Sequence, residues 1–216
     1  MTTSKKQQQT QASNYETAKQ QAQALFLKYD QAKIIRKFQL IHDEQYLYLS
    51  FINRAYRISR SSGAVQWSED GFVTCMEAGH EEVMTIFDVL CYSKPDCHLA
   101  GEYVHMQSLS AIKGGGVSLG ASLFRKTEEQ FDHKDFALVQ ACEKLNGTKI
   151  GRGDVAYQIP VFDFLPARFQ FWNSDEDFGA SIVLFFDKNI LDYMHYETVW
   201  FMAFHLLSRI AEEMEQ

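Results

Sequence analysis

The hydrophobic period of the chain changes several times, and these changes constrain its fold more than any single motif. Apolar residues recur at helical spacing near both ends, whereas two internal regions consist of short aromatic and β-branched runs separated by turn residues. These two patterns are typical of amphipathic helices and of strands, respectively. Because helices and strands come in blocks and do not alternate strictly, we expect an α+β fold and not a doubly wound parallel sheet.

The first helix is expected to begin at Ser13. Ser13 and Glu16 have the spacing of a capping box, and apolar residues then recur at helical spacing up to Tyr29. Residues 1–12 are Thr, Ser, Lys and Gln without a hydrophobic period, which predicts a disordered tail. We therefore expect residues 13–216 to form a single domain, which is large enough to bury a substantial core.

Two antiparallel β-meanders are predicted in the interior of the chain. The first comprises runs 38–41, 46–52 and 55–58, with a fourth strand at 64–67, and the second comprises runs 156–162, 168–172 and 181–186. Further helices are expected over residues 79–93, 135–145 and 196–213. The expected fold is thus α+β, with two meanders packed against about four to five helices and helical at both ends.

Charge and composition exclude several classes of partner. The chain carries 28 acidic and 21 basic residues, a formal net charge of -7. Nucleic acids and anionic membrane surfaces require clustered Lys and Arg, so we expect neither as a partner. No run reaches the roughly 18 apolar residues of a membrane span, and the first residues lack the apolar stretch of a secretory signal. Four cysteines without a CxxC pair then favour a cytoplasmic location and free thiols.

Aromatic residues are unusually abundant, with 17 Phe, 10 Tyr and 3 Trp. Tyr48 and Tyr56 in the first meander and Phe171 and Trp172 in the second, with His205 in the last helix, are candidates for the walls of a cavity. Such a cavity would hold a flat apolar ligand or cofactor, whose identity the sequence leaves unknown. The alternative interpretation is ordinary aromatic packing between the sheets and the helices.

Acidic residues cluster in the C-terminal third. Asp175, Glu176 and Asp177 occupy a predicted hairpin turn, Asp187 ends the following strand, and Glu197 opens the last helix. If the hairpin folds back, these carboxylates can converge on a divalent metal ion or perform acid–base chemistry. Carboxylates in turns also cap local backbone amides or simply face water, which is the alternative here.

A glycine run, Gly114, Gly115 and Gly116, is a candidate anion-binding loop, because the backbone amides at the start of a helix attract anions. The segment lacks the GxxxxGK[ST] spacing of a P-loop and no predicted strand precedes it, so a plain loop is the alternative. The chain also contains neither GxSxG nor HExxH. Whether the protein is an enzyme therefore stays open.

Short motifs along the chain also form a recognisable set. They are Asn14-Tyr15-Glu16-x-Ala18, Phe51-x-x-Arg54-x-Tyr56, Leu99-x-Gly101-Glu102 with Ser108-Leu109, Pro160-x5-Pro166, Trp172-x-x-Asp175-Glu176-Asp177-Phe178, Leu184-Phe185-Phe186-Asp187, and Tyr193 with Glu197. This set resembles the bacterial domain-of-unknown-function family 3786. The chain departs from the family pattern at Tyr103, Asp177 and Gly179, where Trp, Glu and Pro are usual. The resemblance implies no particular activity.

Three functional hypotheses follow from these patterns. The first is a non-enzymatic binding or accessory module that holds a small molecule or cofactor in an aromatic-lined cavity. The second is a metal-assisted enzyme that uses the C-terminal carboxylates. The third is a protein–protein interaction module: the last helix is apolar on nearly all sides, so it is either deeply buried or forms a subunit interface, as in a homodimer.

Overall fold

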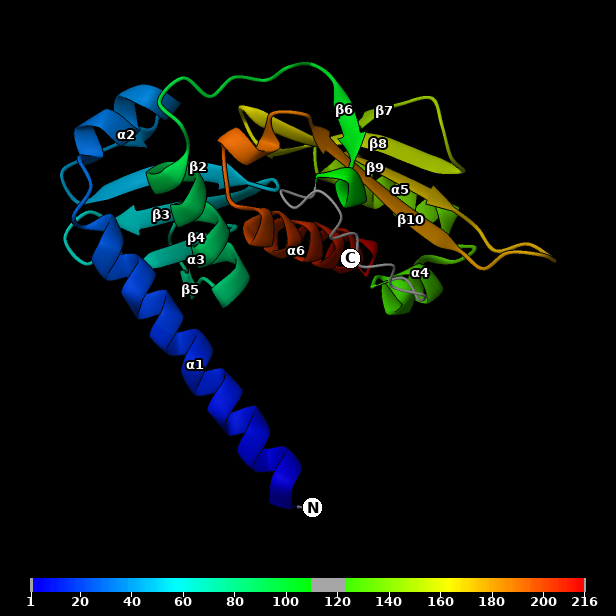
Figure 1. The fold of residues 1–216 in the computed structure, drawn as a ribbon, viewed down its shortest axis with the longest axis horizontal. Coiled ribbons are helices and arrows are strands. Elements are labelled where there is room, and N and C mark those ends of the chain that lie inside the picture. Colours follow the sequence, from blue (N-terminus) through cyan, green and yellow to red (C-terminus); the bar gives the residue numbers. More distant parts are fainter. Residues whose placement is uncertain (1, 110–122, 216) are drawn as a thin grey trace.

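The computed structural model describes residues 2–109 and 123–215, with side chains from residue 14 onward, and it confirms the α+β class. Two antiparallel sheets of five strands lie side by side, with helices packed around them (Figure 1). The N-terminal sheet contains, in chain order, β1 (Ile41–His42), β2 (Tyr46–Phe51), β3 (Arg54–Ser59), β4 (Val65–Ser68) and β5 (Met76–Glu77). The C-terminal sheet has the order β6 (Tyr103–His105), β10 (Ser181–Asp187), β9 (Leu165–Trp172), β8 (Val155–Phe162) and β7 (Thr148–Lys149).

The described part of the chain contains six α-helices. They are α1 (Thr2–Phe26), α2 (Gln31–Phe38), α3 (His80–Phe87), α4 (Arg125–Phe131), α5 (Asp135–Lys144) and α6 (Tyr196–Met214). A π-helical turn, Asp88–Tyr92, continues α3 directly, and short 3₁₀ turns occupy Met106–Ser108 and Ile190–Asp192. None of the helices within the described residues combines the length and the apolar character that a membrane span requires.

The register of the N-terminal sheet explains why strand β2 has aromatic residues on both faces. Leu49 pairs with Tyr56 on the inner face, and Tyr48 pairs with Arg57 on the outer face, because side chains alternate along a strand. The inner face is buried against the helices. On the outer face, the Arg57 guanidinium lies over the rings of Tyr46 and Phe72, at 4.4 and 5.1 Å from their centroids. The outer aromatics therefore pack against a cation and not against a helix.

Helix α6 crosses the middle of the molecule and contacts α3, α4 and α5 (Figure 1). Its apolar stripe is buried as the sequence predicts, and the core is continuous between the two sheets. The sheets meet where the Ile52 amide donates to the Val161 carbonyl at 2.8 Å and Phe51 stacks on Phe162 at 4.8 Å. Because β2 and β8 are in direct contact, the two sheets share one hydrophobic core, and α6 runs along it.

Two sequence-based boundaries near the N-terminus need correction. Helix α1 begins at Thr2 and not at Ser13, whereas the disorder expected for residues 1–12 stays a prediction. That segment contains no Gly or Pro that would interrupt a helix. Helix α2 occupies the start of the expected first strand: Asp30 caps it by accepting from the Lys33 amide at 3.2 Å, and Gln39 ends it in the left-handed conformation. The assignment of residues 13–216 to a single domain stays a prediction.

Gly63 lies in the turn between β3 and β4, where the N-terminal sheet approaches α1, so a substitution at this position tests how closely α1 packs on the sheet. Its φ is +73°, and an added β-carbon would lie 2.8 Å from the Gln23 carbonyl oxygen of α1; Gly71 has a similar φ of +72° with open space around it. An alanine in the left-handed conformation lowers the free energy of unfolding by about 1 kcal/mol or more at either site. At Gly63 the close approach of the new β-carbon to the Gln23 carbonyl oxygen lowers it by about 1 to 3 kcal/mol more. In urea unfolding, Gly63→Ala should therefore destabilise clearly more than the matched Gly71→Ala. Equal losses would contradict the packing of α1.

Candidate functional site

The structure does not bring the five predicted cavity residues together. Tyr48 lies on the outer face of the N-terminal sheet, where its hydroxyl donates to Asp43 Oδ2 at 2.7 Å. Phe171 and Trp172 belong to β9 in the other sheet; Phe171 is buried in the core and Trp172 is half-buried at the end of the strand. Only Tyr56 and His205 meet.

Tyr56 and His205 form a buried cluster with Glu82, the third residue of α3. The Tyr56 hydroxyl donates a short hydrogen bond to Glu82 and lies 3.5 Å from His205 Nε2, which is 3.7 Å from Glu82 Oε1. Glu82 also accepts from the Gly79 amide at the start of α3. His205 stacks on Phe51, with 5.1 Å between the ring centroids. The cluster therefore joins β2 and β3 to both α3 and α6.

The protonation of this cluster follows from its burial. Burial lowers the pKa of His205 from its ordinary 6.5 to about 4, although the Glu82 carboxylate opposes this shift. Burial and the neighbouring Glu82 raise the pKa of Tyr56. Both rings are consequently neutral near pH 7, as expected for a hydrogen-bonded core and not for a ligand site.

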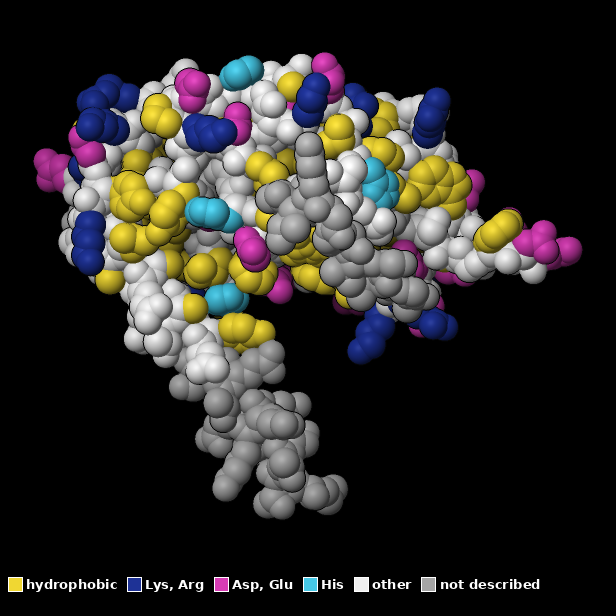
Figure 2. Space-filling model, viewed as in Figure 1, with side chains coloured by type: hydrophobic (Ala, Val, Ile, Leu, Met, Phe, Trp, Pro, Cys, Tyr) yellow, Lys and Arg dark blue, Asp and Glu magenta, His cyan; other side chains and the backbone are white. Residues whose placement is uncertain are grey.

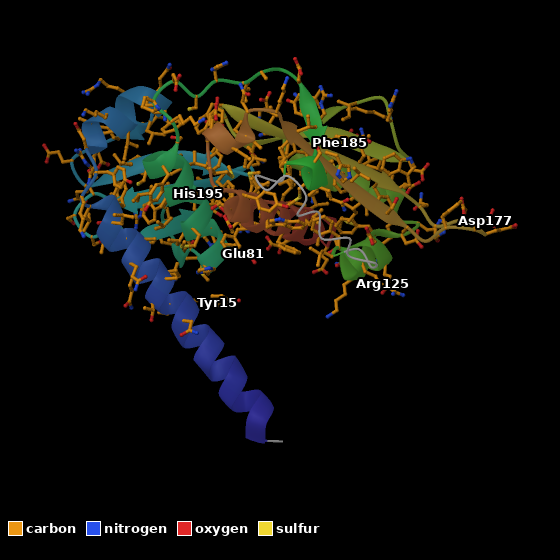
Figure 3. The ribbon with its side chains drawn as sticks, viewed as in Figure 1. Tyr15, Glu81, Arg125, Asp177, Phe185 and His195 are labelled. Carbon is orange, nitrogen blue, oxygen red and sulfur yellow. The ribbon has the colours of Figure 1, made fainter. Side chains whose placement is uncertain are left out.

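In the acidic turn between β9 and β10, the carboxylate of Asp175 accepts hydrogen bonds from backbone amides of the same turn. Asp175 Oδ1 accepts from the amides of Asp177 and Phe178, at 2.9 and 2.7 Å, in a local turn motif. Glu176 and Asp177 are exposed. Figure 3 shows Asp177 at the far tip of the hairpin, on the other side of the molecule from His195. The hairpin does not fold back toward the helices.

Asp187 is buried and binds backbone. Its carboxylate accepts from the amides of Ala100, Gly101 and Asn189 at 2.8 to 2.9 Å, which fixes the segment before β6 to the end of β10. Glu197 lies separately at the start of α6. Within the described residues no three His, Cys, Asp or Glu side chains are arranged to hold a metal ion. Gly114, Gly115 and Gly116 lie outside the described residues.

A cavity of about 370 Å³ lies between α1, α3 and the start of α6, and we call it the α1–α3–α6 cavity. Its walls are mostly apolar, and hydrophobic side chains are visible at the surface where α1 meets the rest of the molecule (Figure 2). The lining residues are Ala18, Gln21, Ala22 and Leu25 of α1, Met84 and Phe87 of α3, Asp88, Cys91 and Tyr92 of the π-helical turn, and His195, Glu197, Thr198 and Phe201 at α6.

A carboxylate–imidazole pair lies in the wall of this cavity. Asp88 is buried, with 8% of its side chain exposed, and its Oδ1 lies 2.6 Å from His195 Nδ1. Its other oxygen accepts from the His195 backbone amide at 2.7 Å. His195 is the residue before α6 and is 61% exposed; it lies at the junction of α3 and α6 (Figure 3). One carboxylate thus holds both the start of α6 and the imidazole ring.

This pairing sets the chemistry that the imidazole can perform. Because an ionised carboxylate only accepts hydrogen bonds, Nδ1 of His195 must carry the proton that it donates to Asp88. Nε2 of the neutral ring is then an acceptor. Tyr92 packs its ring edge-on against the imidazole, with 5.2 Å between the centroids. The ring is therefore fixed in orientation, as in sites where a histidine accepts a proton.

The π-helical turn places Asp88, Cys91 and Tyr92 around the cavity. Short π-helical segments inside helices are frequent at functional sites, because the extra residue redirects the side chains that follow. Burial, with a smaller contribution from Asp88, raises the pKa of the Cys91 thiol to about 12. Cys91 is consequently protonated and contributes to the wall and not to a nucleophile.

A second, larger groove of about 1110 Å³ runs beside α2 and shares Cys91 with the first cavity. Lys28, Lys33 and Arg36 line it, but Asp30 and Asp163 lie at the same groove and offset part of their charge. A further lysine in its wall, Lys37, is held by the Ser93 and Lys94 carbonyls at 2.9 and 2.6 Å. The groove has no counterpart to the oriented Asp88–His195 pair, so the smaller cavity is the stronger candidate.

Comparison with known families agrees with the resemblance seen in the sequence. The profile of a family described as Domain of unknown function (DUF3786) matches residues 30–209. The chain belongs to this family. No curated protein and no solved structure matches the chain. The DUF3786 match includes both Asp88 and His195, whereas α1, which supplies one wall of the cavity, precedes the matched residues.

The sequence of this DUF3786 chain alone does not indicate that Asp88 pairs with His195. It equally gives no sign that Glu82 meets Tyr56 and His205. The available signal was Asp88 itself, because it is a charged residue within a run from Val83 to Leu90 that is otherwise mostly apolar. A buried carboxylate needs hydrogen-bond donors, but its partner lies 107 residues away and cannot be identified from spacing.

The carboxylate of Asp187 is expected to stabilise the fold without binding a metal. Asp187→Ala leaves three backbone amides without their acceptor and should lower the free energy of unfolding by about 3 kcal/mol. The matched change Asp177→Ala, on the exposed hairpin, should change it by less than about 0.5 kcal/mol. Chemical unfolding with and without EDTA measures both effects. A stabilisation by metal ions that is lost in Asp187→Ala would contradict this account.

The buried His205 is expected to make stability depend on pH. Because its pKa is lowered in the folded protein, the unfolded state binds more protons, and stability falls as the pH drops from about 6.5 toward about 4. The contribution of this one group is on the order of 2 to 3 kcal/mol. Unfolding free energies at pH 7 and pH 4.5 should differ less for His205→Gln than for wild type. The exposed control, His98→Gln, should keep the wild-type difference; an unchanged difference in His205→Gln would refute the assignment.

Proposed function

We propose that the protein is a binding module for a small, largely apolar molecule that occupies the α1–α3–α6 cavity. The observation that carries this proposal is the oriented Asp88–His195 pair in the wall of a mostly apolar cavity. Ligand sites typically combine apolar walls with a few polar groups that converge on one point. The proposal keeps the aromatic-lined cavity expected from the sequence but places it at different residues.

The size and shape of the cavity favour a compact ligand. A volume of about 370 Å³ lies toward the small end of ligand pockets, which suits a single substituted aromatic ring. Phe87, Phe201 and Tyr92 supply flat apolar surface, and Leu25 and Met84 supply adaptable surface. A flat molecule can thus bury most of its apolar area between the three helices.

The charges around the cavity favour a ligand that is not an anion. Asp88 and Glu197 lie in its wall, and none of the described residues that line it is Lys or Arg. A ligand that already carries a negative charge when it enters would therefore meet like charge, with no Lys or Arg in the described lining to compensate it. A neutral molecule that donates a hydrogen bond to His195 Nε2 fits this environment.

The other hypotheses receive less support from the arrangement of the chain. The carboxylates of the proposed metal-assisted enzyme are separated between an exposed hairpin, the end of β10 and the start of α6. Most of the apolar surface of α6 is covered by neighbouring elements, although Phe204 remains 37% exposed. A homodimer through this helix stays a prediction.

Filling the cavity tests the proposal. Ala22 of α1 lines the cavity, whereas Ala24 of the same helix is exposed and does not. Phenol is expected to shift the Met84 methyl signal in ¹³C-methionine NMR of wild type and of Ala24→Phe. In Ala22→Phe its affinity should fall at least about tenfold, because the new ring occupies the site.

The Met84 signal is assigned by its loss in Met84→Leu, and thermal unfolding verifies that each variant folds. Met76, which is exposed on β5, is the internal reference within every spectrum. The proposal is wrong if millimolar phenol leaves the Met84 methyl signal of wild type in place. It is equally wrong if folded Ala22→Phe binds phenol as tightly as Ala24→Phe does.

A further inference from the structure

We propose that His195 and Asp88 form an acid–base pair, in which His195 Nε2 removes a proton from a weakly acidic hydroxyl of the molecule bound in the α1–α3–α6 cavity. The ligand class is a neutral phenol or enol. This inference rests on the proposed binding function and goes beyond it, because it assigns a proton transfer to the site. His195 touches the ligand and is the catalytic residue, and Asp88 acts through it as a positioning residue.

The geometry meets the requirements for a proton acceptor. The 2.6 Å contact between Asp88 Oδ1 and His195 Nδ1 fixes the tautomer, so the free lone pair is on Nε2. The second contact of Asp88, with the His195 backbone amide at 2.7 Å, fixes the backbone from which the ring projects. Two bonds from one buried carboxylate leave the ring little freedom to turn away.

Negatively charged side chains lie around the imidazole that would receive the proton. When Nε2 receives a proton, the imidazolium lies against the Asp88 carboxylate, and Glu197 adds a second negative charge at the same cavity. The remaining titratable groups that face the cavity are the Tyr92 hydroxyl and the Cys91 thiol, while α1 contributes only uncharged side chains there. The described lining contains no Lys or Arg.

The proton transfer is balanced without any co-reactant. The ligand O–H bond breaks, an Nε2–H bond forms, and the electron pair of the broken bond stays on the ligand oxygen. The products are a phenolate or enolate next to an imidazolium whose other N–H points to Asp88. The reverse step returns the proton, so the pair both activates and reprotonates an enol-type oxygen.

The probe is 4-nitrophenol, because its phenolate absorbs at longer wavelength than the neutral phenol and so reports the proton directly. Binding is followed separately by the Met84 methyl signal. At a pH below the pKa of the free phenol, the bound phenol in wild type should show a phenolate-to-phenol ratio at least about tenfold higher than in solution, which corresponds to one pKa unit. The control His98→Gln, an exposed histidine outside the cavity, should behave like wild type.

The variants separate proton transfer from binding. His195→Gln should still bind 4-nitrophenol at Met84 but lose the excess phenolate. Asp88→Asn keeps an acceptor for Nδ1 but removes the negative charge, so it should bind with a smaller phenolate excess; chemical unfolding verifies that both variants fold. Binding in wild type with no excess phenolate overturns this inference and leaves the proposed binding function intact. Absence of any shift at Met84 overturns both.

Discussion

The fold depends on how the largely apolar helix α6 is buried by its neighbours and how its first turn is fixed in place. Helix α6 carries apolar side chains on most of its surface, so it must be buried between other elements. α3 and α5 pack against it, and a single buried carboxylate, Asp88, accepts from the amide of His195 immediately before its first turn. Because an unpaired buried carboxylate is costly, the position of α3 and the start of α6 determine each other.

The same contact generates the candidate site. Asp88 lies in the π-helical turn that follows α3, and this turn also directs Cys91 and Tyr92 toward the space under α1. The carboxylate that secures the start of α6 therefore also orients an imidazole in the wall of a mostly apolar cavity. His205, in the cluster with Tyr56 and Glu82, contrasts with His195: it is buried in the core, and burial keeps it neutral.

Features that depend on local pattern were predictable from the sequence, and those that depend on distant partners were not. Strands β8 and β10 lie within about one residue of their predicted limits, because their alternation is visible locally. The two-residue strands β1, β5 and β7 exist only through pairing with a neighbour, and α2, at eight residues, is shorter than the sequence window over which a helical period is judged. Asp88 and His195 are 107 residues apart, so only the folded chain shows that they meet.

The central claim is that the cavity between α1, α3 and α6 holds a small molecule against His195. A crystal structure of the protein grown with 4-nitrophenol tests it most directly. The account predicts a ring bound between Leu25, Phe87 and Phe201, with its oxygen within hydrogen-bonding distance of His195 Nε2. An empty cavity at saturating concentration, or a ring bound only in the larger groove beside α2, would contradict it.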